Sequence, residues 1–392
     1  MRFASNNAGA ALVVHSGGPT AVINASLLGL VEEAAKRLRF KALYGARFGL
    51  EGILKQDFVD LLAFDRPRLL RVAQAPSSAL GTSRRELGPD GAPRLLDVFR
   101  ACDIRCLFYT GGNGSMGTAA QIAALARAAR FDLQVIGIPK TIDNDLAETD
   151  HTPGYASAAR FFAGAVRDIG ADNRALPGQV QFVEVLGRNA GWIVAATALA
   201  RRRPADAPHL VYFPERPLPL DRLLGDVERV YGRLGRCVVA VCEGQLDEHG
   251  QPFGADVRGN WRGSLAMNLA HRLATLVTAH LKLKARGEKP GLLGRVNRAA
   301  RSPVDWREAR MCARAAVRAA ARGVSGEMVT LVRQQGPVYR VTTGLAALER
   351  IAGAERLFPQ RWLDREAGDA HPEFLEYIAP LVGEIEAYED LG

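Results

Sequence analysis

Short apolar runs alternate with longer amphipathic segments along most of this chain. The runs have the length and continuity of strands that are buried on both faces of a parallel sheet. The clearest are Ala10–His15, Ile104–Tyr109, Leu133–Ile138, Val180–Val185 and His209–Phe213. Segments such as 118–129 and 155–172 carry apolar residues at helical spacing. Because the alternation occurs twice, from 10 to about 140 and from about 155 to 290, we expect an α/β protein with two doubly wound, Rossmann-like lobes and the active site in the cleft between them.

Two of the loops that follow these strands are rich in glycine. They are Ser16–Asn24, after the first strand, and Thr110–Gly117, after the strand that ends at Tyr109. A glycine turn between a strand and a helix offers backbone N–H groups and a helix dipole to an anion. Neither loop is a Walker A or GxGxxG motif, and any strand-to-helix turn can use glycine, so each loop alone is only moderately specific.

A third loop, Pro139–Asp145, adds reactive side chains. Pro139 ends the preceding strand because proline cannot donate to a β-ladder. The side chains in question are Lys140, Thr141, Asp143 and Asp145. A cation beside paired carboxylates suits phosphoryl transfer, in which one group stabilises phosphate charge, one accepts a proton and one holds Mg²⁺. A polar turn is the alternative for this loop alone; three such loops at one sheet edge favour a phosphate site.

Composition and charge narrow the class of protein. The formal net charge is +9, but the 51 Lys and Arg are scattered, and only seven of them are Lys. Such a preference for arginine over lysine is typical of the base composition of a genome and is not specific to a nucleic-acid-binding surface. The positive charge therefore favours an anionic small substrate over nucleic acid. No apolar run reaches the roughly 18 residues of a membrane span, and the N-terminus lacks a signal peptide pattern. The five cysteines have no metal-ligand spacing. We therefore expect a cytoplasmic protein that does not bind membranes.

Six motifs together resemble the 6-phosphofructokinase family. On the phosphate side they are Ser16–Asn24, Gly111–Ser115 and Pro139–Asp145, in the family's order and at its spacing. Further along they are Val183–Trp192, Val241–Gly244 and Leu293–Arg298, the last followed by Ser302-Pro303. The resemblance covers about residues 10 to 330 and is specific as a set. It implies transfer of a phosphoryl group to the 1-hydroxyl of fructose 6-phosphate.

The resemblance also implies roles for individual residues. Asp143 would be the general base, Thr141 would bind the moving phosphoryl group, and Asp145 and Asn113 would hold Mg²⁺. The donor would be bound by Gly18, Arg84, Gly111, Gly112, Gly114 and Ser115. The sugar phosphate would be bound by Thr141, Asp143, Leu186, Gly187, Arg188, Glu243, Arg295 and Arg298. Residues 1–150, with about 299–350, would form the donor lobe, and residues 151–298, with a C-terminal tail of about 351–392, the sugar-phosphate lobe.

The donor is indicated mainly by Lys140, because pyrophosphate-using members of the family have lysine where ATP-using members have glycine. With pyrophosphate the leaving group is orthophosphate, without an adenosine to supply binding energy, so a local cation is needed at the bridging oxygen. Asn113 also departs from the aspartate usual in ATP-using members, whereas Gly114 is the ATP-type residue. We weight Lys140 most and expect pyrophosphate, with ATP as the alternative.

Other departures from the family pattern bear on regulation and binding. Leu28 and Glu32 replace first-helix arginines that bind an allosteric anion in many ATP-using members, so such control is not expected. Gln179 replaces an arginine of the phosphate clamp, for which Arg174 is a candidate substitute. A homodimer or homotetramer is expected. The competing hypotheses are a catalytically silent sugar-phosphate sensor, a lipid or NAD kinase, and a nucleic-acid-binding module. The intact Asp143 and Asp145 argue against the sensor, and Glu243 with the two late arginines against the kinases.

Overall fold

The computed structural model describes residues 9–37, 40–88, 91–253, 268–363 and 369–389. The chain divides into two compact units. Unit 1 is Met1–Gly154 with Asp305–Arg356, and unit 2 is Tyr155–Val304 with Leu357–Gly392. Each unit has its own sheet and hydrophobic core.

The sheet of unit 1 has, among the described residues, the strand order β11-β10-β5-β4-β1-β2-β3. The strands are β1 (Ala10–His15), β2 (Leu43–Ala46), β3 (Phe58–Asp60), β4 (Ile104–Gly111), β5 (Gln134–Pro139), β10 (Glu327–Arg333) and β11 (Val341–Ala347). The two edge strands, β3 and β11, pair antiparallel, and the other pairs are parallel. The carboxyl ends of β1, β4 and β5 therefore lie side by side at one edge.

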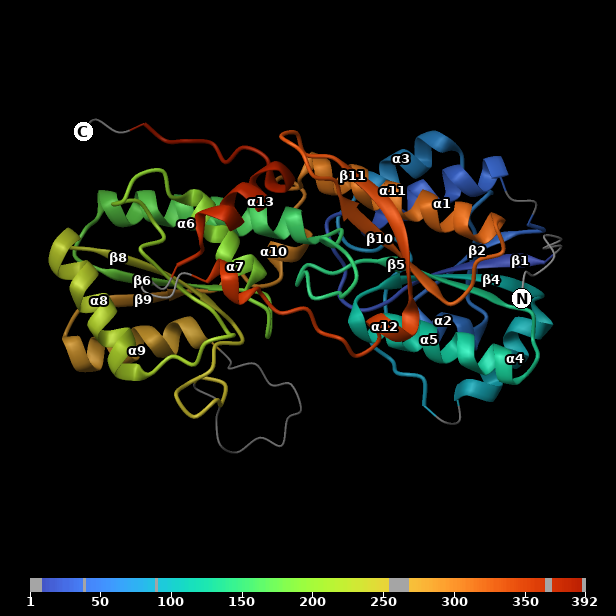
Figure 1. Cartoon of the computed structure of the whole chain (residues 1–392), viewed down its shortest axis with the longest axis horizontal. Helices are drawn as coiled ribbons and strands as arrows, with labels where there is room; N and C mark the ends of the chain where they lie inside the picture. The colour runs from blue at the N-terminus through green and yellow to red at the C-terminus, as the bar shows by residue number, and fades with distance from the viewer. Residues whose placement is uncertain (1–8, 38–39, 89–90, 254–267, 364–368, 390–392) are drawn as a thin grey trace. The chain divides into compact units, whose positions relative to one another are not determined.

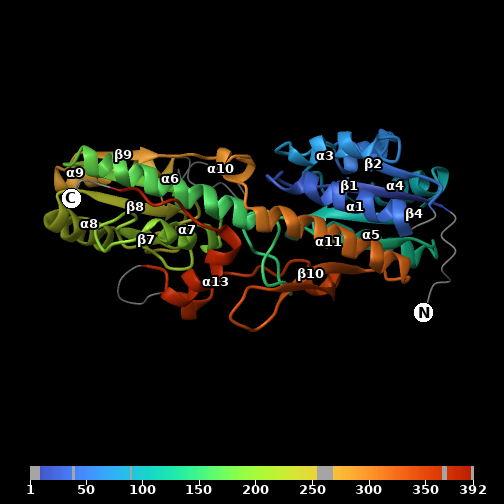
Figure 2. The ribbon, with the colours of Figure 1, turned by 90° about the horizontal axis from the view of Figure 1, so that it is seen from above.

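Helices cover both faces of this sheet (Figure 1). One face carries α1 (Ile23–Arg37), α3 (Arg66–Gln74) and α11 (Pro303–Ala321). The other carries α2 (Leu50–Lys55), α4 (Gly91–Ala101), α5 (Asn113–Ala128) and α12 (Leu348–Ile351). Figure 2 shows α1 and α11 running over the strands together. Their approach needs Gly29, because a Cβ there would lie 2.5 Å from the Arg310 carbonyl oxygen.

Unit 2 contains, within the described residues, a parallel sheet of order β7-β8-β6-β9. Its strands are β6 (Val180–Val185), β7 (Leu210–Tyr212), β8 (Cys237–Cys242) and β9 (Ala285–Glu288). Its helices are α6 (Tyr155–Ala175), α7 (Trp192–Ala196), α8 (Leu220–Leu234), α9 (Leu269–Leu281), α10 (Leu293–Val296) and α13 (Pro372–Val382), with 3₁₀ helices η1 (Thr197–Ala200) and η2 (Gln360–Trp362). The apolar faces of α8 and α9 pack on one side of the strands, and α6 lies on the other (Figure 1).

The expectation of an α/β fold with two parallel-rich sheets is confirmed. Some element bounds differ. The helix expected over 118–129 begins at Asn113, because its first turn closes on Gly112, and glycines there hide the helical pattern. The acidic tail from Asp364 onward is expected to be helical, but in its described part α13 covers only Pro372–Val382 and the chain continues without helix to 389. Asp364 itself lies outside the described residues. No helix in the described ranges is long and apolar enough to cross a membrane.

Candidate active site

The three predicted loops meet at the carboxyl edge of the unit 1 sheet. Strand pairing sets His15 beside Thr110 and Gly111 beside Pro139. The ladder continues into the loops, since the Ser16 N–H donates to the Thr110 carbonyl at 2.9 Å and the Lys140 N–H to that of Gly111 at 3.0 Å. Three segments that lie apart in the sequence therefore form one continuous surface.

The ammonium group of Lys140 is turned into the first glycine loop. Its Nζ donates to the Gly18 carbonyl oxygen at 2.6 Å, and the residue is only 2 % exposed. Gly17 has a φ of +76°, and a Cβ there would lie 3.3 Å from Nζ. Since a buried charge needs hydrogen-bond partners, this cation is held in place by the backbone of the loop.

The second glycine loop is shaped by close contacts. A Cβ at Gly111 would meet the Ser115 Oγ at 2.1 Å, so only glycine fits there. At Gly112 a Cβ would lie 3.4 Å from the Cβ of Thr141, which brings this loop against the third one. In contrast, a Cβ at Gly114 would meet nothing within 4 Å, and the residue is exposed. Ser115 itself is buried in the first turn of α5.

Arg84 is brought to the same edge by its neighbour. Ser83 forms a parallel bridge with Ser16, and its carbonyl accepts the Gly17 N–H at 3.0 Å. Arg84 is exposed, while the next arginine, Arg85, pairs with Glu51 at 3.1 Å. The sequence pattern did not identify Ser83. A Gly-Thr-Ser run before paired arginines is the signal that was present.

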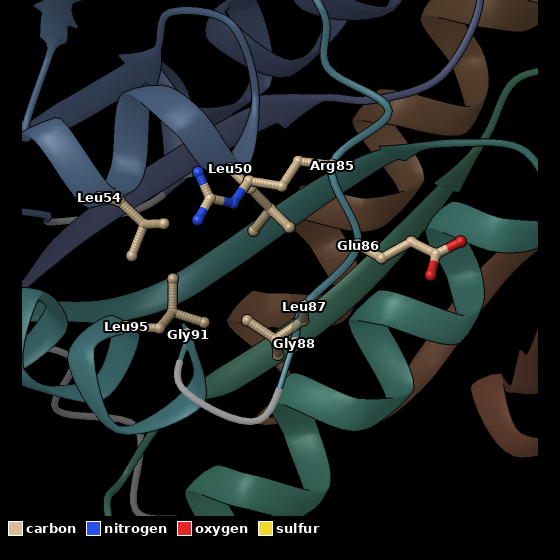
Figure 3. A pocket seen from close by; sticks show the side chains of 8 residues that line it. All are labelled: Leu50, Leu54, Arg85, Glu86, Leu87, Gly88, Gly91 and Leu95. Carbon is tan, nitrogen blue, oxygen red and sulfur yellow. The ribbon is translucent and has the colours of Figure 1, made fainter.

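A cavity of about 220 Å³ lies beyond Arg84. It is lined by Leu50, Leu54, Arg85, Glu86, Leu87, Gly88, Gly91 and Leu95. Figure 3 shows Arg85 reaching toward Leu54 of α2, while the Glu86 carboxylate points the other way. The lining is mostly leucine and includes none of the predicted catalytic residues, so this cavity is separate from the phosphate loops.

A buried histidine lies beneath the loops and was not identified from the sequence. His15 is fully buried, and its Nδ1 lies 2.8 Å from the Ser78 Oγ, which donates to the Gly81 carbonyl. Burial, and secondly the positive charge of Lys140, lowers the pKa of His15 to about 3. The imidazole is therefore neutral at physiological pH and does not repel the Lys140 ammonium.

The two carboxylates flank a buried amide residue. Asp143 and Asp145 are half-buried, and Asn144 between them is fully buried with a φ of +56°. The Asp143 N–H donates to the Thr141 Oγ1 at 3.1 Å, and Thr141 is itself bridged to Gly154. The loop is therefore closed on itself, and both carboxylates project from an ordered backbone.

Asn113, predicted to hold a metal ion, has both ends of its carboxamide engaged within unit 1. The Gly353 N–H donates to Oδ1 at 3.0 Å, and Nδ2 donates to the Ala354 carbonyl at 2.8 Å. These bonds orient the side chain toward the segment that follows α12. Among the described residues there is no group of three or more His, Cys, Asp or Glu side chains arranged to hold a metal ion.

In unit 2, the predicted sugar-binding residues lie at the ends of two paired strands. Val185 of β6 pairs with Cys242 of β8, so the turn 186–188 lies beside Glu243. The backbone N–H groups of Gly187 and Arg188 both approach the Glu243 Oε1 at 3.4 Å. Burial raises the pKa of Glu243, which the two N–H groups oppose. Leu186 is half-buried and Arg188 is exposed.

The late arginines follow β9, which is parallel to β6, so this segment leaves the sheet at the same carboxyl edge as the turn 186–188. Arg295 is on α10, and Arg298 follows it and is exposed. A Cβ at Gly294 would lie 2.2 Å from the ring of Phe162, so glycine lets α10 pack tightly on α6. Arg174, the candidate substitute for the arginine missing at Gln179, lies 3.6 Å from Asp206.

Comparison with known proteins agrees with these features. The sequence model of the family Phosphofructokinase matches residues 10–320. A pyrophosphate--fructose 6-phosphate 1-phosphotransferase of Rhodospirillum rubrum is 39% identical over 96% of this chain and 94% of its own. A sulfofructose kinase of Alkalicoccus urumqiensis is 31% identical over 93% of this chain and 94% of its own. The crystal structure of a pyrophosphate-dependent phosphofructokinase from Marinobacter aquaeolei has a TM-score of 0.87 and 32% identity, covering 98% of this chain and 94% of the other.

A doubly wound fold with three phosphate-type loops at one sheet edge defines this protein as a phosphotransferase. The chain belongs to the phosphofructokinase family.

Proposed function

We propose that this chain is a diphosphate–fructose-6-phosphate 1-phosphotransferase. It transfers a phosphoryl group from pyrophosphate to the 1-hydroxyl of fructose 6-phosphate, producing fructose 1,6-bisphosphate and orthophosphate in a reversible reaction of glycolysis and gluconeogenesis. The assignment is supported by relatives that are named pyrophosphate--fructose 6-phosphate 1-phosphotransferase and that match most of this chain. The observation that carries it is the ammonium of Lys140, buried and bonded to the donor loop at Gly18.

The donor side uses a preorganised cation. The bond between the bridging oxygen and the transferred phosphorus breaks, and negative charge develops on the departing orthophosphate. A fixed cation in a site with little water stabilises that charge more than a mobile, solvated one would. Lys140 meets this description, and Gly18, Arg84, Gly111, Gly112, Gly114 and Ser115 complete the donor site in the proposal.

The acceptor is activated by Asp143. Its carboxylate accepts the proton of the sugar 1-hydroxyl as that oxygen bonds to phosphorus, a contribution worth about 10²- to 10⁴-fold in rate. In the reverse direction the same group returns the proton. Thr141, whose hydroxyl accepts the Asp143 N–H, sets the position of this carboxylate and contacts the moving phosphoryl group.

The residues present fit Mg²⁺ bound together with pyrophosphate. Mg²⁺ commonly takes one or two carboxylates, with phosphate oxygens and water completing its shell, so a three-residue protein cluster is not required. We assign it to Asp145 rather than to Asn113, whose carboxamide is engaged by Gly353 and Ala354. The ion would neutralise phosphate charge and orient the donor.

Fructose 6-phosphate is assigned to residues of unit 2. Glu243 accepts hydrogen bonds from the sugar hydroxyls, with Leu186, Gly187 and Arg188 beside it. Arg295 and Arg298 supply charge-assisted bonds to the 6-phosphate. The sulfofructose kinase among the relatives makes the 6-substituent an open point of specificity, since a sulfonate is also an anion that arginine binds.

ATP as donor is the second candidate, and one observation favours it. Gly114 is exposed and has open space where a Cβ would lie, so no side chain at this position excludes the α-phosphate of a nucleotide. The cytoplasmic location and a homodimeric or homotetrameric state stay predictions of the sequence.

The deciding experiment is a donor panel on the purified chain. Pyrophosphate, ATP and polyphosphate are each supplied with fructose 6-phosphate and Mg²⁺, and fructose 1,6-bisphosphate is measured. We expect turnover with pyrophosphate, and formation of pyrophosphate from fructose 1,6-bisphosphate and orthophosphate. Turnover with ATP and none with pyrophosphate would overturn the donor. Binding of fructose 6-phosphate without turnover of any donor would identify a sensor instead.

A further inference from the structure

The Asp143–Asp145 loop is held by one arginine that is distant in the sequence. Arg356 donates through Nε and Nη2 to the Asn144 carbonyl oxygen, at 3.2 and 3.0 Å. Its Nη1 donates to the carbonyls of Thr149 and Asp150. Its backbone N–H donates to the Asp145 carbonyl at 2.8 Å. A single residue thus donates hydrogen bonds to four backbone carbonyl groups of the segment 144–150.

The bonded peptide lies between the two carboxylates. Asn144 has left-handed backbone geometry, φ +56°, and no exposed surface. Its side-chain oxygen accepts the Thr152 N–H at 2.9 Å, which fixes one side of the turn. Its backbone carbonyl is fixed by Arg356 on the other. The plane of the 144–145 peptide, and with it the direction of each flanking side chain, depends on both sets of bonds.

The guanidinium group suits this task better than other side chains. It is planar and presents five donors in a fixed fork, so it can bind several carbonyls at once and hold their relative positions. Lysine has a compact ammonium and a flexible stem, and it cannot reproduce that spacing.

We propose that Arg356 is a positioning residue for the phosphoryl transfer reaction: it holds the Asn144–Asp145 peptide so that Asp143 and Asp145 face the reacting groups. This rests on the proposed function, in which Asp143 is the base. A displacement of about 1 Å in such a group can cost on the order of 10²-fold in rate. Because Arg356 acts on the loop and not on the sugar, its loss should lower kcat while leaving the KM for fructose 6-phosphate nearly unchanged.

The test compares Arg356→Ala and Arg356→Lys with Arg350→Ala. Arg350 is a matched control because it also bonds this segment, to the Glu148 carboxylate at 2.8 Å, but with a side chain that is 67% exposed. We expect kcat to fall about 10- to 100-fold in Arg356→Ala, less in Arg356→Lys, and less than about twofold in Arg350→Ala. Added guanidinium ion at non-denaturing concentration, against equal NaCl, should restore part of the Arg356→Ala activity.

A purely structural arginine would behave differently. It would lower the thermal unfolding midpoint and leave kcat unchanged at a temperature where the variant is folded, so added guanidinium would have no effect on activity beyond that of NaCl. Either that result, or an equal loss in Arg350→Ala, would overturn the proposal. If Arg356→Ala does not fold, Arg356→Lys and its KM-against-kcat split decide.

Donor use by the wild-type enzyme distinguishes a failure of the proposed function from a failure of the proposed role of Arg356. If it uses ATP and not pyrophosphate, the donor assignment fails and the same variants are compared with ATP. If it turns over pyrophosphate and Arg356→Ala matches it, the donor assignment holds and the positioning role fails.

Discussion

The carboxyl edges of the two sheets hold their cations in different ways. In unit 1 the Lys140 ammonium is bonded to the Gly18 backbone and is 2 % exposed. In unit 2 Arg188 and Arg298 are exposed to solvent. A fixed, buried cation is preorganised for charge that develops during reaction, whereas an exposed arginine is screened and must lose rotamer freedom when it binds. The contrast agrees with our proposal, in which unit 1 carries the chemistry and unit 2 carries recognition.

The proposed functional carboxylates of the two units, Asp143 and Glu243, are also held in position by different kinds of contact. The loop that carries Asp143 is bonded through its Asn144 carbonyl to Arg356 of the returning segment 305–356. Asp305 of the same segment accepts the N–H of Gly154, which is bridged to Thr141 of the loop. Glu243 instead closes onto its own neighbouring turn, through the N–H groups of Gly187 and Arg188. The unit 1 group is thus positioned by distant residues, and the unit 2 group by adjacent strand ends.

The largest expected effect is in unit 1, at the proposed base. Asp143→Asn keeps the shape of the side chain but can no longer accept the proton of the sugar hydroxyl. We expect kcat to fall by about 10²- to 10⁴-fold, with circular dichroism unchanged. Asp132→Asn, at an exposed turn of the same unit, is the control. Turnover within threefold of wild type would mean that the base is another group and that unit 1 was assigned wrongly.

The next effect is at the buried cation. Lys140→Met keeps the length of the side chain and removes the charge, so the leaving orthophosphate loses its stabilising contact. We expect kcat to drop by roughly 10²- to 10³-fold with little change in the KM for fructose 6-phosphate. Lys41→Met is the control, because that lysine is 65% exposed and pairs with Asp103. A change confined to KM would place Lys140 among the binding groups, which would remove the contrast with unit 2.

A smaller effect of opposite kind is expected in unit 2. Arg298→Ala removes a charge-assisted contact to the 6-phosphate, so the KM for fructose 6-phosphate should rise about 10- to 100-fold while kcat changes less. The exposed Arg233, in the last turn of α8, serves as control in Arg233→Ala. A fall in kcat with an unchanged KM would show that unit 2 also takes part in the chemical step.

The smallest expected effect is on the pH dependence of folding stability, and it can be measured at one buried histidine in each unit. His151, in unit 1, is buried, which lowers its pKa, but hydrogen bonds to Asp150 at 2.8 Å and Glu308 at 2.6 Å outweigh burial and raise the pKa above 6.5. The facing groups are completed by Arg333, beside Asp150, and by the Tyr339 hydroxyl, which donates to Glu308. Protonated His151 therefore stabilises the folded state below about pH 6.5, and this contribution is lost as pH rises through its folded pKa.

For His209, in unit 2, the pKa shift is in the opposite direction. Burial lowers its pKa to about 4, so it favours the folded state when neutral, and that contribution is lost in acid. In urea unfolding at several pH values, His151→Gln should remove a decline in stability on the alkaline side, and His209→Gln should alter only the acid side. An unchanged alkaline slope in His151→Gln would show that the pair with Glu308 is not charged.

Much of the site could be predicted because each motif is contiguous. The strand, loop and helix around Ser16–Asn24 and around Gly111–Ser115 are set by local pattern, and parallel pairing then places their ends together. The start of α5 was missed by five residues, since glycines carry no apolar pattern. The predicted Mg²⁺ role of Asn113 came from its place in the family motif, and its bonds to Gly353 and Ala354 come from a segment that no local pattern connects to it.

The sequence by itself determined the α/β order and the three phosphate-type loops, because these depend on neighbours within a few residues. The resemblance to the family added the interpretation of Lys140 as the residue that indicates the donor. Only the tertiary structure decided which distant groups support them. Arg356 reaches Asn144 across 212 positions, and Ser83 joins the first loop across 67. Such contacts arise when the packing of distant segments brings a hydrogen-bond donor to a buried carbonyl group. The periodicity of apolar residues along the chain does not contain this long-range information.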